Sequence, residues 1–232
     1  MNADASSPET DAAWAASHGR SAQRILADIA KAEGRSAKGR SIELIGKRLL
    51  SLPPALLIEG GWKILNLSEN PGLDPSLLSE LERLDIVVLS GCELPAFDLL
   101  PPSGLKRLAL DRNGLSHWPA GLAGVGDDLA YLNIAKNLLT RIPDDVAELR
   151  VLDTLHASNN NITVVSPAIG QLGSLTRLYL LGNRELSTLP VEILDLPQAC
   201  DVSLAITSLP ASFQKARTIG DLRKVWGDLD PS

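Results

Sequence analysis

The residues that could do chemistry are few, and they lie far apart along the chain. The histidines are His18, His117 and His156. The adjacent pair Cys200 and Asp201 has no histidine nearby in the sequence, although a cysteine nucleophile needs a base within hydrogen-bond reach. Zinc needs several Cys or His ligands at short spacing, and the sequence has no such group. We therefore expect no catalytic residues, no metal and no cofactor, and we predict that the chain is not an enzyme.

A single spacing of leucines instead recurs eight times between residues 39 and 210. The template is L-x-x-L-x-L-x-x-N-x-L, usually followed by x-x-L-P. Its fourth position falls at Ile42, Leu65, Val87, Leu108, Leu132, Leu155, Leu178 and Val202, at intervals of 23, 22, 21, 24, 23, 23 and 24 residues. A repeat of this length cannot bury its own apolar side chains, so the units must stack into a solenoid with a continuous core.

Each residue type in the template has a structural role. The L-x-x-L-x-L stretch alternates between buried and exposed positions, as a strand with one buried face does. The asparagine stands where the chain leaves the strand, and its amide can satisfy backbone groups of neighbouring coils. It is replaced by Lys47 in the first unit and Cys92 in the third, and the last unit lacks it. Irregular first and last units are typical of capping repeats.

The repeats resemble the leucine-rich repeat family. The resemblance rests on the segments 113–119, 137–143 and 183–190, each running from the template asparagine to the L-P step or its equivalent, and it spans about residues 40 to 210. Within the family they are similar to the 23-residue intracellular class, which includes Ras-suppressor-type and plant intracellular Ras-group-related proteins. Ala157 departs from the pattern in a core leucine position. The resemblance implies an α/β fold, a curved horseshoe-shaped solenoid with a parallel sheet on its concave face and short helical caps.

The remaining sequence divides into two flanking regions. Residues 1–11 are polar and acidic and are predicted to be disordered. Residues 12–39 are predicted to form a helical N-terminal cap, with a helix over 21–33 that Ser21 could cap. Residues 40–210 form the repeats. Residues 211–232 are predicted to be a C-terminal cap and tail, with one helix over 213–226 and a frayed end from residue 228.

Composition limits the environment and the partners. The net charge of −6 and pI of about 5.1 argue against non-specific nucleic-acid binding, because no basic excess exists to displace counterions. The sequence has neither an apolar run long enough to cross a membrane nor a signal-peptide pattern at its start. Cys92 and Cys200 are several coils apart, which makes a disulfide between them implausible. A reducing, cytoplasmic location is expected.

We predict that the binding site lies on the concave face, where outward side chains of adjacent strands meet. Tyrosine and arginine, which are favoured at interface hot spots, gather on the middle coils. The predicted partner-binding residues are Arg107, Arg112, Tyr131, Asn133, Lys136, His156, Arg177 and Tyr179. Their basic character favours a partner with an acidic patch. A smaller apolar patch is predicted at Ile64, Ile86 and Val88. A site on the convex face or the caps remains an alternative.

Both the solenoid architecture and the resemblance imply a non-enzymatic protein-protein interaction module. The expected role is an intracellular scaffold or adaptor, in signalling for example. The alternative is a substrate-recognition subunit or effector-type protein that acts with a separate ubiquitin-ligase component. Self-association through the convex side or the caps is a third hypothesis, and the sequence does not fix the oligomeric state.

Overall fold

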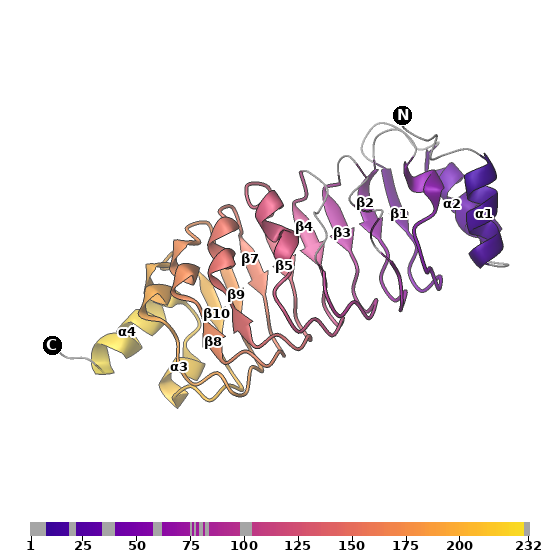
Figure 1. Ribbon diagram of the computed structural model, residues 1–232. Coiled ribbons are helices and arrows are strands. Elements are labelled where there is room, and N and C mark those ends of the chain that lie inside the picture. The colour runs from indigo at the N-terminus through magenta and orange to yellow at the C-terminus, as the bar shows by residue number, and fades with distance from the viewer. Residues whose placement is uncertain are drawn as a thin grey trace.

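The computed structural model describes residues 8–18, 22–33, 40–57, 62–74, 76, 78, 81, 84–97 and 104–229. These residues form an elongated stack of eight coils between two helical ends (Figure 1). Each coil contributes one strand to a parallel sheet, in the order of the sequence. The strands are β1 (Arg40–Glu43), β2 (Trp62–Asn66), β3 (Ile86–Val88), β4 (Arg107–Ala109), β5 (Tyr131–Asn133), β7 (Thr154–His156), β9 (Arg177–Tyr179) and β10 (Asp201–Ser203). The predicted solenoid with a parallel sheet is confirmed.

The register of the sheet is the one that the leucine spacing predicts. Leu108 pairs with Leu132, Leu132 with Leu155, and Leu155 with Leu178. These leucines are fully buried, and so is Ala157, whose departure from the template is absorbed by the core. The aligned positions therefore form one continuous apolar core along the whole stack.

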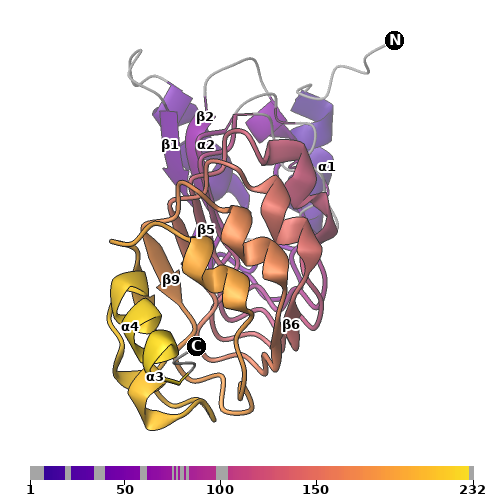
Figure 2. The same ribbon diagram turned by 90° about the vertical axis from the view of Figure 1, so that its left-hand side faces the viewer.

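The return legs are short 3-10 helices stacked on the side of the molecule opposite the sheet (Figure 2). They are η2 (Pro54–Leu57), η4 (Ala120–Val125), η5 (Asp144–Glu148), η6 (Pro167–Gln171) and η7 (Val191–Asp195). Pro143 and Pro190 precede η5 and η7 directly, because proline fixes φ near the value that starts a helix. A second, two-stranded sheet of β6 (Arg141–Ile142) and β8 (Val164–Val165) forms where two return legs begin.

The template asparagines form a buried ladder of hydrogen bonds between coils. Asn137 Nδ2 donates to the carbonyl of Leu110 in the preceding coil at 2.9 Å and to that of Ile134 in its own coil at 2.9 Å. Its Oδ1 accepts from the amides of Asn113 and Leu115 at 2.9 and 3.0 Å. The same pattern recurs at the other template asparagines, which are Asn70, Asn113, Asn160 and Asn183. The predicted role of this residue is confirmed.

Two substituted positions of the ladder keep part of its hydrogen bonding. The Cys92 thiol donates to the carbonyl of Leu67 in the preceding coil at 3.2 Å. In the last coil Thr207 takes the asparagine position, and its hydroxyl donates to the carbonyl of Leu204 at 2.7 Å. The last unit therefore lacks the amide but retains one side-chain donor at the turn.

The residue before the ladder position has a left-handed backbone in all eight coils, which the sequence did not predict. These residues and their φ values are Gly46 (61°), Glu69 (59°), Gly91 (68°), Arg112 (59°), Lys136 (55°), Asn159 (55°), Gly182 (79°) and Ile206 (57°). This conformation costs a non-glycine residue about 1–2 kcal/mol. Five of the eight positions accept that cost because the turn must point the ladder side chain inward.

The N-terminal cap consists of α1 (Pro8–His18) and α2 (Ala22–Glu33), which cover the first coil. Trp14, Ile25 and Ile29 are buried in the core. Because α1 begins at Pro8, the predicted disorder over residues 1–11 extends too far; residues 1–7, like the predicted capping residue Ser21, lie outside the described part of the chain.

The C-terminal cap is two helices, α3 (Ala211–Lys215) and α4 (Ile219–Leu229), so the prediction of one helix over 213–226 is wrong. A capping box explains the break. Asp221 Oδ2 accepts from the Thr218 amide at 3.2 Å, and the Asp221 amide donates to the Thr218 hydroxyl at 3.2 Å. The T-x-x-D sequence therefore starts a new helix. Phe213 and Trp226 still pack together across the break, with ring centroids 5.3 Å apart. The predicted fray from residue 228 is wrong for residues 228 and 229, because α4 runs to Leu229; residues 230–232 lie outside the described part.

Candidate functional site

The eight predicted residues share one surface, the side of the eight-stranded sheet that the 3-10 helices leave uncovered. We call this surface the strand face. Strand pairing places Arg107 beside Tyr131, and it places Asn133, His156 and Tyr179 on three successive strands. Arg112 and Lys136 follow at the exposed left-handed position of their coils. Arg177 is two strands away from Tyr131, with Thr154 between them.

Arg107 and Tyr131 form a stacked pair at the centre of the strand face. The guanidinium carbon of Arg107 lies 4.1 Å from the centroid of the Tyr131 ring. A cation over an aromatic face stabilises a partly exposed pair by about 0.5–1 kcal/mol. The contact favours this arrangement of the two side chains, and Tyr131 is only half-buried.

His156 and Tyr179 form a second aromatic pair further along the sheet. Their ring centroids are 5.1 Å apart with an interplanar angle of 64°, an edge-to-face contact. Burial lowers the pKa of His156 below its ordinary 6.5, and the nearby Lys136 lowers it further, while Asp111 acts in the opposite direction. The imidazole is therefore neutral at pH 7, and the positive charge of this surface does not include His156.

Asp111 is the functional-surface residue that the sequence analysis missed. Its carboxylate accepts from the Ser90 hydroxyl at 2.5 Å, from Asn133 Nδ2 at 3.1 Å and from Arg112 Nε at 3.1 Å. It thus connects three consecutive coils and fixes the orientation of Asn133. The sequence signal that could have identified Asp111 is its position in the repeat, three residues after the fourth leucine position.

Asp153 plays a similar part for Arg177. Arg177 Nη1 lies 3.2 Å from Asp153 Oδ2 and donates to the Thr154 hydroxyl at 3.3 Å. Asp153 also accepts from the Thr176 hydroxyl at 2.5 Å, and this bond is the main reason that the pKa of Asp153 is lowered; the Thr154 hydroxyl and Arg177 act in the same direction.

The predicted basic cluster is therefore balanced in part by acid. Arg112 is paired with Asp111 and Arg177 with Asp153. Arg107 and Lys136 form no ion pair with any residue in the described part of the chain. The interpretation of the surface as a simple basic patch is wrong for two of its four cations, because each has a carboxylate on its own coil or on the coil before it.

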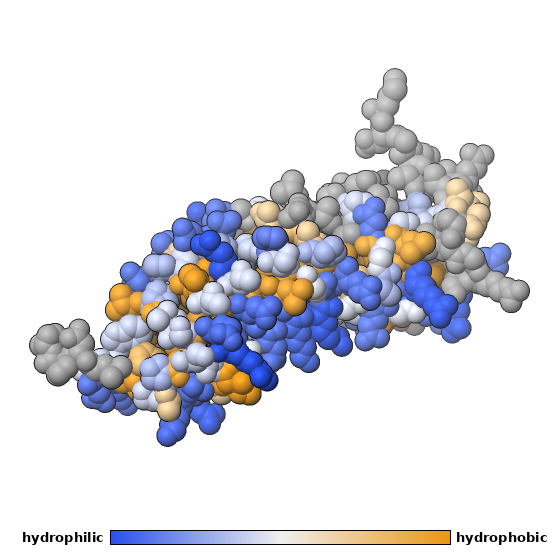
Figure 3. All heavy atoms as spheres, turned by 60° about the horizontal axis from the view of Figure 1, so that its bottom comes forward, coloured by the Kyte–Doolittle hydropathy of each residue, from blue (hydrophilic) through white to orange (hydrophobic). Residues whose placement is uncertain are grey.

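Apolar side chains on the surface are dispersed. Ile64 is 36% exposed, and its neighbours Ile86 and Val88 are half-buried, so the predicted apolar patch is present but small. On the face at the bottom of Figure 1, hydrophobic side chains form separate small groups among hydrophilic ones (Figure 3).

The residues that could do chemistry remain apart. His117 lies in a turn, where its Nδ1 is 2.9 Å from the Ser116 hydroxyl, and His156 lies on the strand face. Burial, with smaller contributions from Asp201 and Asp153, raises the pKa of Cys200 to about 12, so its thiol is not activated. Within the described residues, no group of three His, Cys, Asp or Glu side chains could hold a metal ion. The side chain of His18 lies outside the described residues.

A family model and one known protein match parts of this chain. Residues 103–162 and 127–184 match the family model described as leucine rich repeat. The adenylate cyclase of Schizosaccharomyces pombe is 30% identical over 131 residues, which is 56% of this chain and 7% of the cyclase, so the chain spans a small part of that relative.

Solved structures show the same architecture. An LRR protein of Leptospira interrogans has 26% identity and a TM-score of 0.55, covering 78% of this chain and 40% of that one. Internalin C2 of Listeria monocytogenes shares the fold at 18% identity, with a TM-score of 0.58 over 79% of this chain and 92% of its own. The repeat match shows leucine-rich repeats over residues 103–184, and the asparagine ladder and the eight-stranded parallel sheet show the leucine-rich repeat fold along the described chain.

Proposed function

We propose that this protein is a non-enzymatic interaction module that binds a protein partner on its strand face. The observation that carries the proposal is the pair of preformed aromatic contacts there, Arg107 with Tyr131 and His156 with Tyr179. Leucine-rich repeat domains are typically protein-binding modules, and aromatic and arginine anchors dominate the energetics of such interfaces.

Preorganisation is what makes these two pairs suitable anchors. Fixing a flexible side chain at an interface costs about 0.5–1.5 kcal/mol, and a side chain already held in place avoids much of that cost. Arg107 is held by stacking on Tyr131, and Asn133 between the two pairs is held by Asp111. The surface therefore presents rigid rings with hydrogen-bonding groups between them.

The free cations define the expected partner. Arg107 and Lys136 form no ion pair with described residues, whereas Arg112 and Arg177 are already neutralised by aspartates. An acidic patch on the partner is thus expected to face Arg107 and Lys136, and not the whole stripe of basic residues. Asp111 and Asp153 would repel acidic groups of a partner placed beside them. They therefore favour partners whose acidic groups face Arg107 and Lys136.

The proposed setting is the cytoplasm, in the role of a scaffold or adaptor of the 23-residue intracellular class. Cys92 and Cys200 are both free and buried, which fits a reducing compartment. No described helix is long and apolar enough to cross a membrane.

The test is a triple variant, Arg107→Glu, Tyr131→Ala and Arg177→Glu, in quantitative affinity purification from cells. The matched control carries Arg141→Glu, Leu138→Ala and Arg184→Glu, which make the same change in net charge and truncate one large side chain at exposed positions off the strand face.

We expect the first variant to lose its main partner and the control to keep it, with both giving the circular dichroism spectrum of the wild type. Tyr131→Ala alone should shorten the residence time of the complex, since anchor residues act mainly on dissociation. Full recovery of the partner by the folded strand-face variant would move the site to the opposite face or the caps.

A further inference from the structure

Two backbone donors of the last coil have no partner among the described residues. In each of the first seven coils, the amide two residues after the fourth leucine position donates to a carbonyl of the following coil, and so does the amide two residues later. In the seventh coil, Leu180 donates to Ser203 and Gly182 to Ala205, both at 2.9 Å. The equivalent amides of the last coil belong to Leu204 and Ile206, and neither donates to a described residue.

The C-terminal cap closes only the beginning of this sheet edge. The Val202 amide donates to the carbonyl of Arg217 at 2.7 Å, and the Ile219 amide donates to the carbonyl of Cys200 at 3.0 Å. After β10 the chain continues through residues 204–210 into α3. Gln214 of α3 fixes the helix by donating to the carbonyls of Thr207 and Leu209. The beginning of β10 is thus capped, and beyond its end the amides of Leu204 and Ile206 have no partner among the described residues, with Leu204 1% exposed and Ile206 58% exposed.

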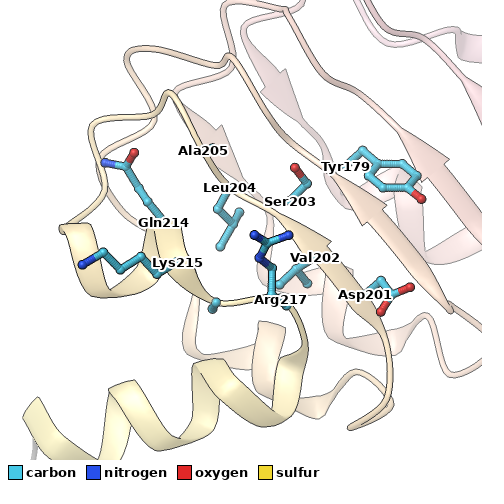
Figure 4. Close-up of a pocket in the computed structure, with 10 residues that line it drawn as sticks. Tyr179, Asp201, Val202, Ser203, Leu204, Ala205, Gln214, Lys215 and Arg217 are labelled. Atoms are coloured by element: carbon cyan, nitrogen blue, oxygen red, sulfur yellow. The ribbon is translucent and has the colours of Figure 1, made fainter.

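A groove of about 760 Å³ lies between β10 and the cap, and Leu204 is among its lining residues (Figure 4). This volume is within the range of ligand pockets, about 300–1,000 Å³. The Arg217 side chain points into the groove beside Ser203, and it forms no ion pair with a described residue. Asp201, the acidic residue of the lining, lies on the far side of Val202 and points away from Arg217 (Figure 4).

We propose that this groove binds an extended peptide of a protein partner, which adds to β10 as the next strand of the sheet. Two of its backbone carbonyls, two residues apart, accept from the amides of Leu204 and Ile206, as Ser203 and Ala205 do for the seventh coil. A peptide carboxylate pairs with Arg217. Strand addition to an open sheet edge is an established mode of peptide recognition, in which main-chain bonds supply affinity and side-chain pockets supply specificity.

The charge of the groove selects the acidic peptide over a second copy of this chain. Edge-to-edge pairing of two copies would bring the same cap segment, and Arg217 with it, against its equivalent. Like charges facing one another oppose that association. A peptide with an Asp or Glu side chain instead supplies the missing counter-charge.

This groove adjoins the proposed strand-face site, because Tyr179 is among its lining residues, and the test distinguishes the two sites. A library of random nine-residue peptides displayed on phage is selected against the intact protein, and the enriched sequences are made as synthetic peptides. We expect them to carry Asp or Glu. Their affinity should fall by about tenfold or more in Arg217→Glu and in Ala205→Trp, which fills the groove. It should be unchanged in Arg184→Glu and in the strand-face triple variant.

Amide hydrogen exchange gives the direct readout of strand addition. Bound peptide should slow exchange at Leu204 and Ile206 by about tenfold or more, because both amides gain an acceptor. The proposal is overturned by enriched peptides without acidic residues, by binding indifferent to Arg217→Glu and Ala205→Trp, or by unchanged exchange at both amides. A dimer in light scattering that Ala205→Trp dissociates would assign the edge to self-association instead.

Discussion

Three consecutive asparagines in the sixth coil allow the hydrogen-bond ladder to be tested with its controls built in. Asn159 and Asn161 are exposed, whereas Asn160 is only 6% exposed. Asn160 Oδ1 accepts from the Leu139 amide at 3.1 Å, and its Nδ2 donates to the carbonyl of Ile134 at 3.0 Å. The perturbation is replacement of each asparagine in turn by alanine.

The expected loss in the free energy of unfolding for Asn160→Ala depends on which hydrogen-bonding groups are left without a partner. The Leu139 amide has no other acceptor among the described residues, so it becomes an unsatisfied buried donor. The three carbonyls bonded by Asn160 each keep another donor: those of Ile134 and Ala157 still accept from another ladder asparagine, and that of Ser158 still accepts from the Lys136 amide. One orphaned buried donor costs about 1–3 kcal/mol, and we expect a loss of that size in the free energy of unfolding.

Asn137→Ala should cost more than Asn160→Ala. It orphans two amides, those of Asn113 and Leu115, and it removes the side-chain donor to the Leu110 carbonyl. We expect about 2–5 kcal/mol, less than the sum of separate losses because water can enter the turn.

The exposed neighbours set the baseline in urea unfolding followed by circular dichroism. Asn161→Ala should stay within about 0.5 kcal/mol of the wild type. Asn159→Ala should cost about 1 kcal/mol because asparagine tolerates the left-handed backbone better than alanine, and Asn159→Gly should not show that cost. If Asn160→Ala and Asn161→Ala have equal midpoints at equal m-values, the ladder contributes nothing and our account of the turns is wrong.

Two further predictions concern stability. Leu155→Ala in the middle of the stack should lower the free energy of unfolding by about 2–5 kcal/mol, and Leu44→Ala should lower it less because the first coil and its cap can unfold locally; equal losses in urea unfolding would contradict a stack of separable coils. For His156, the lowered pKa means that the unfolded chain binds a proton first, so stability should fall as pH drops below about 6.5 towards the lower folded value. Urea midpoints measured on both sides of that pH should show this fall in the wild type and lose part of it in His156→Gln. The lowered pKa of Asp153 acts in a different window, since its contribution is present above 3.8 and is lost at lower pH.

The core of the fold could be predicted because its signal is local and repeated. A leucine spacing of 21–24 residues fixes which residues face inward and which strands pair, as the pairing of Leu108, Leu132 and Leu155 shows. The asparagine could be assigned its role because a buried turn leaves amides and carbonyls that only a side-chain amide can satisfy together. The same buried amides and carbonyls need a partner at the turn of each repeat.

The caps could be predicted only in outline, because they occur once and lack that repetition. Apolar residues at Phe213, Ile219 and Leu222 are compatible with a single helix, and the break depends on the local hydrogen bonds of Thr218 and Asp221. That capping box was legible in the sequence, where apolar spacing alone suggested continuity. A strong local cap therefore outweighed the longer pattern.

The charges of the strand face could not be predicted from a list of outward residues, because acidic side chains bind polar and basic side chains on the same or an adjacent coil. Neighbouring parallel strands lie about 4.8 Å apart, so a side chain on one coil always reaches the next. Asp111 reaches Asn133, and Asp153 reaches Arg177, across 22 and 24 residues of sequence. Among the four cations of the predicted site, Arg107 and Lys136 are the two without an ion pair to a described residue, and we propose that these two meet the partner. Under our proposal, the aspartates that pair with these cations, on the same coil or the one before it, matter more for partner choice than the number of basic residues.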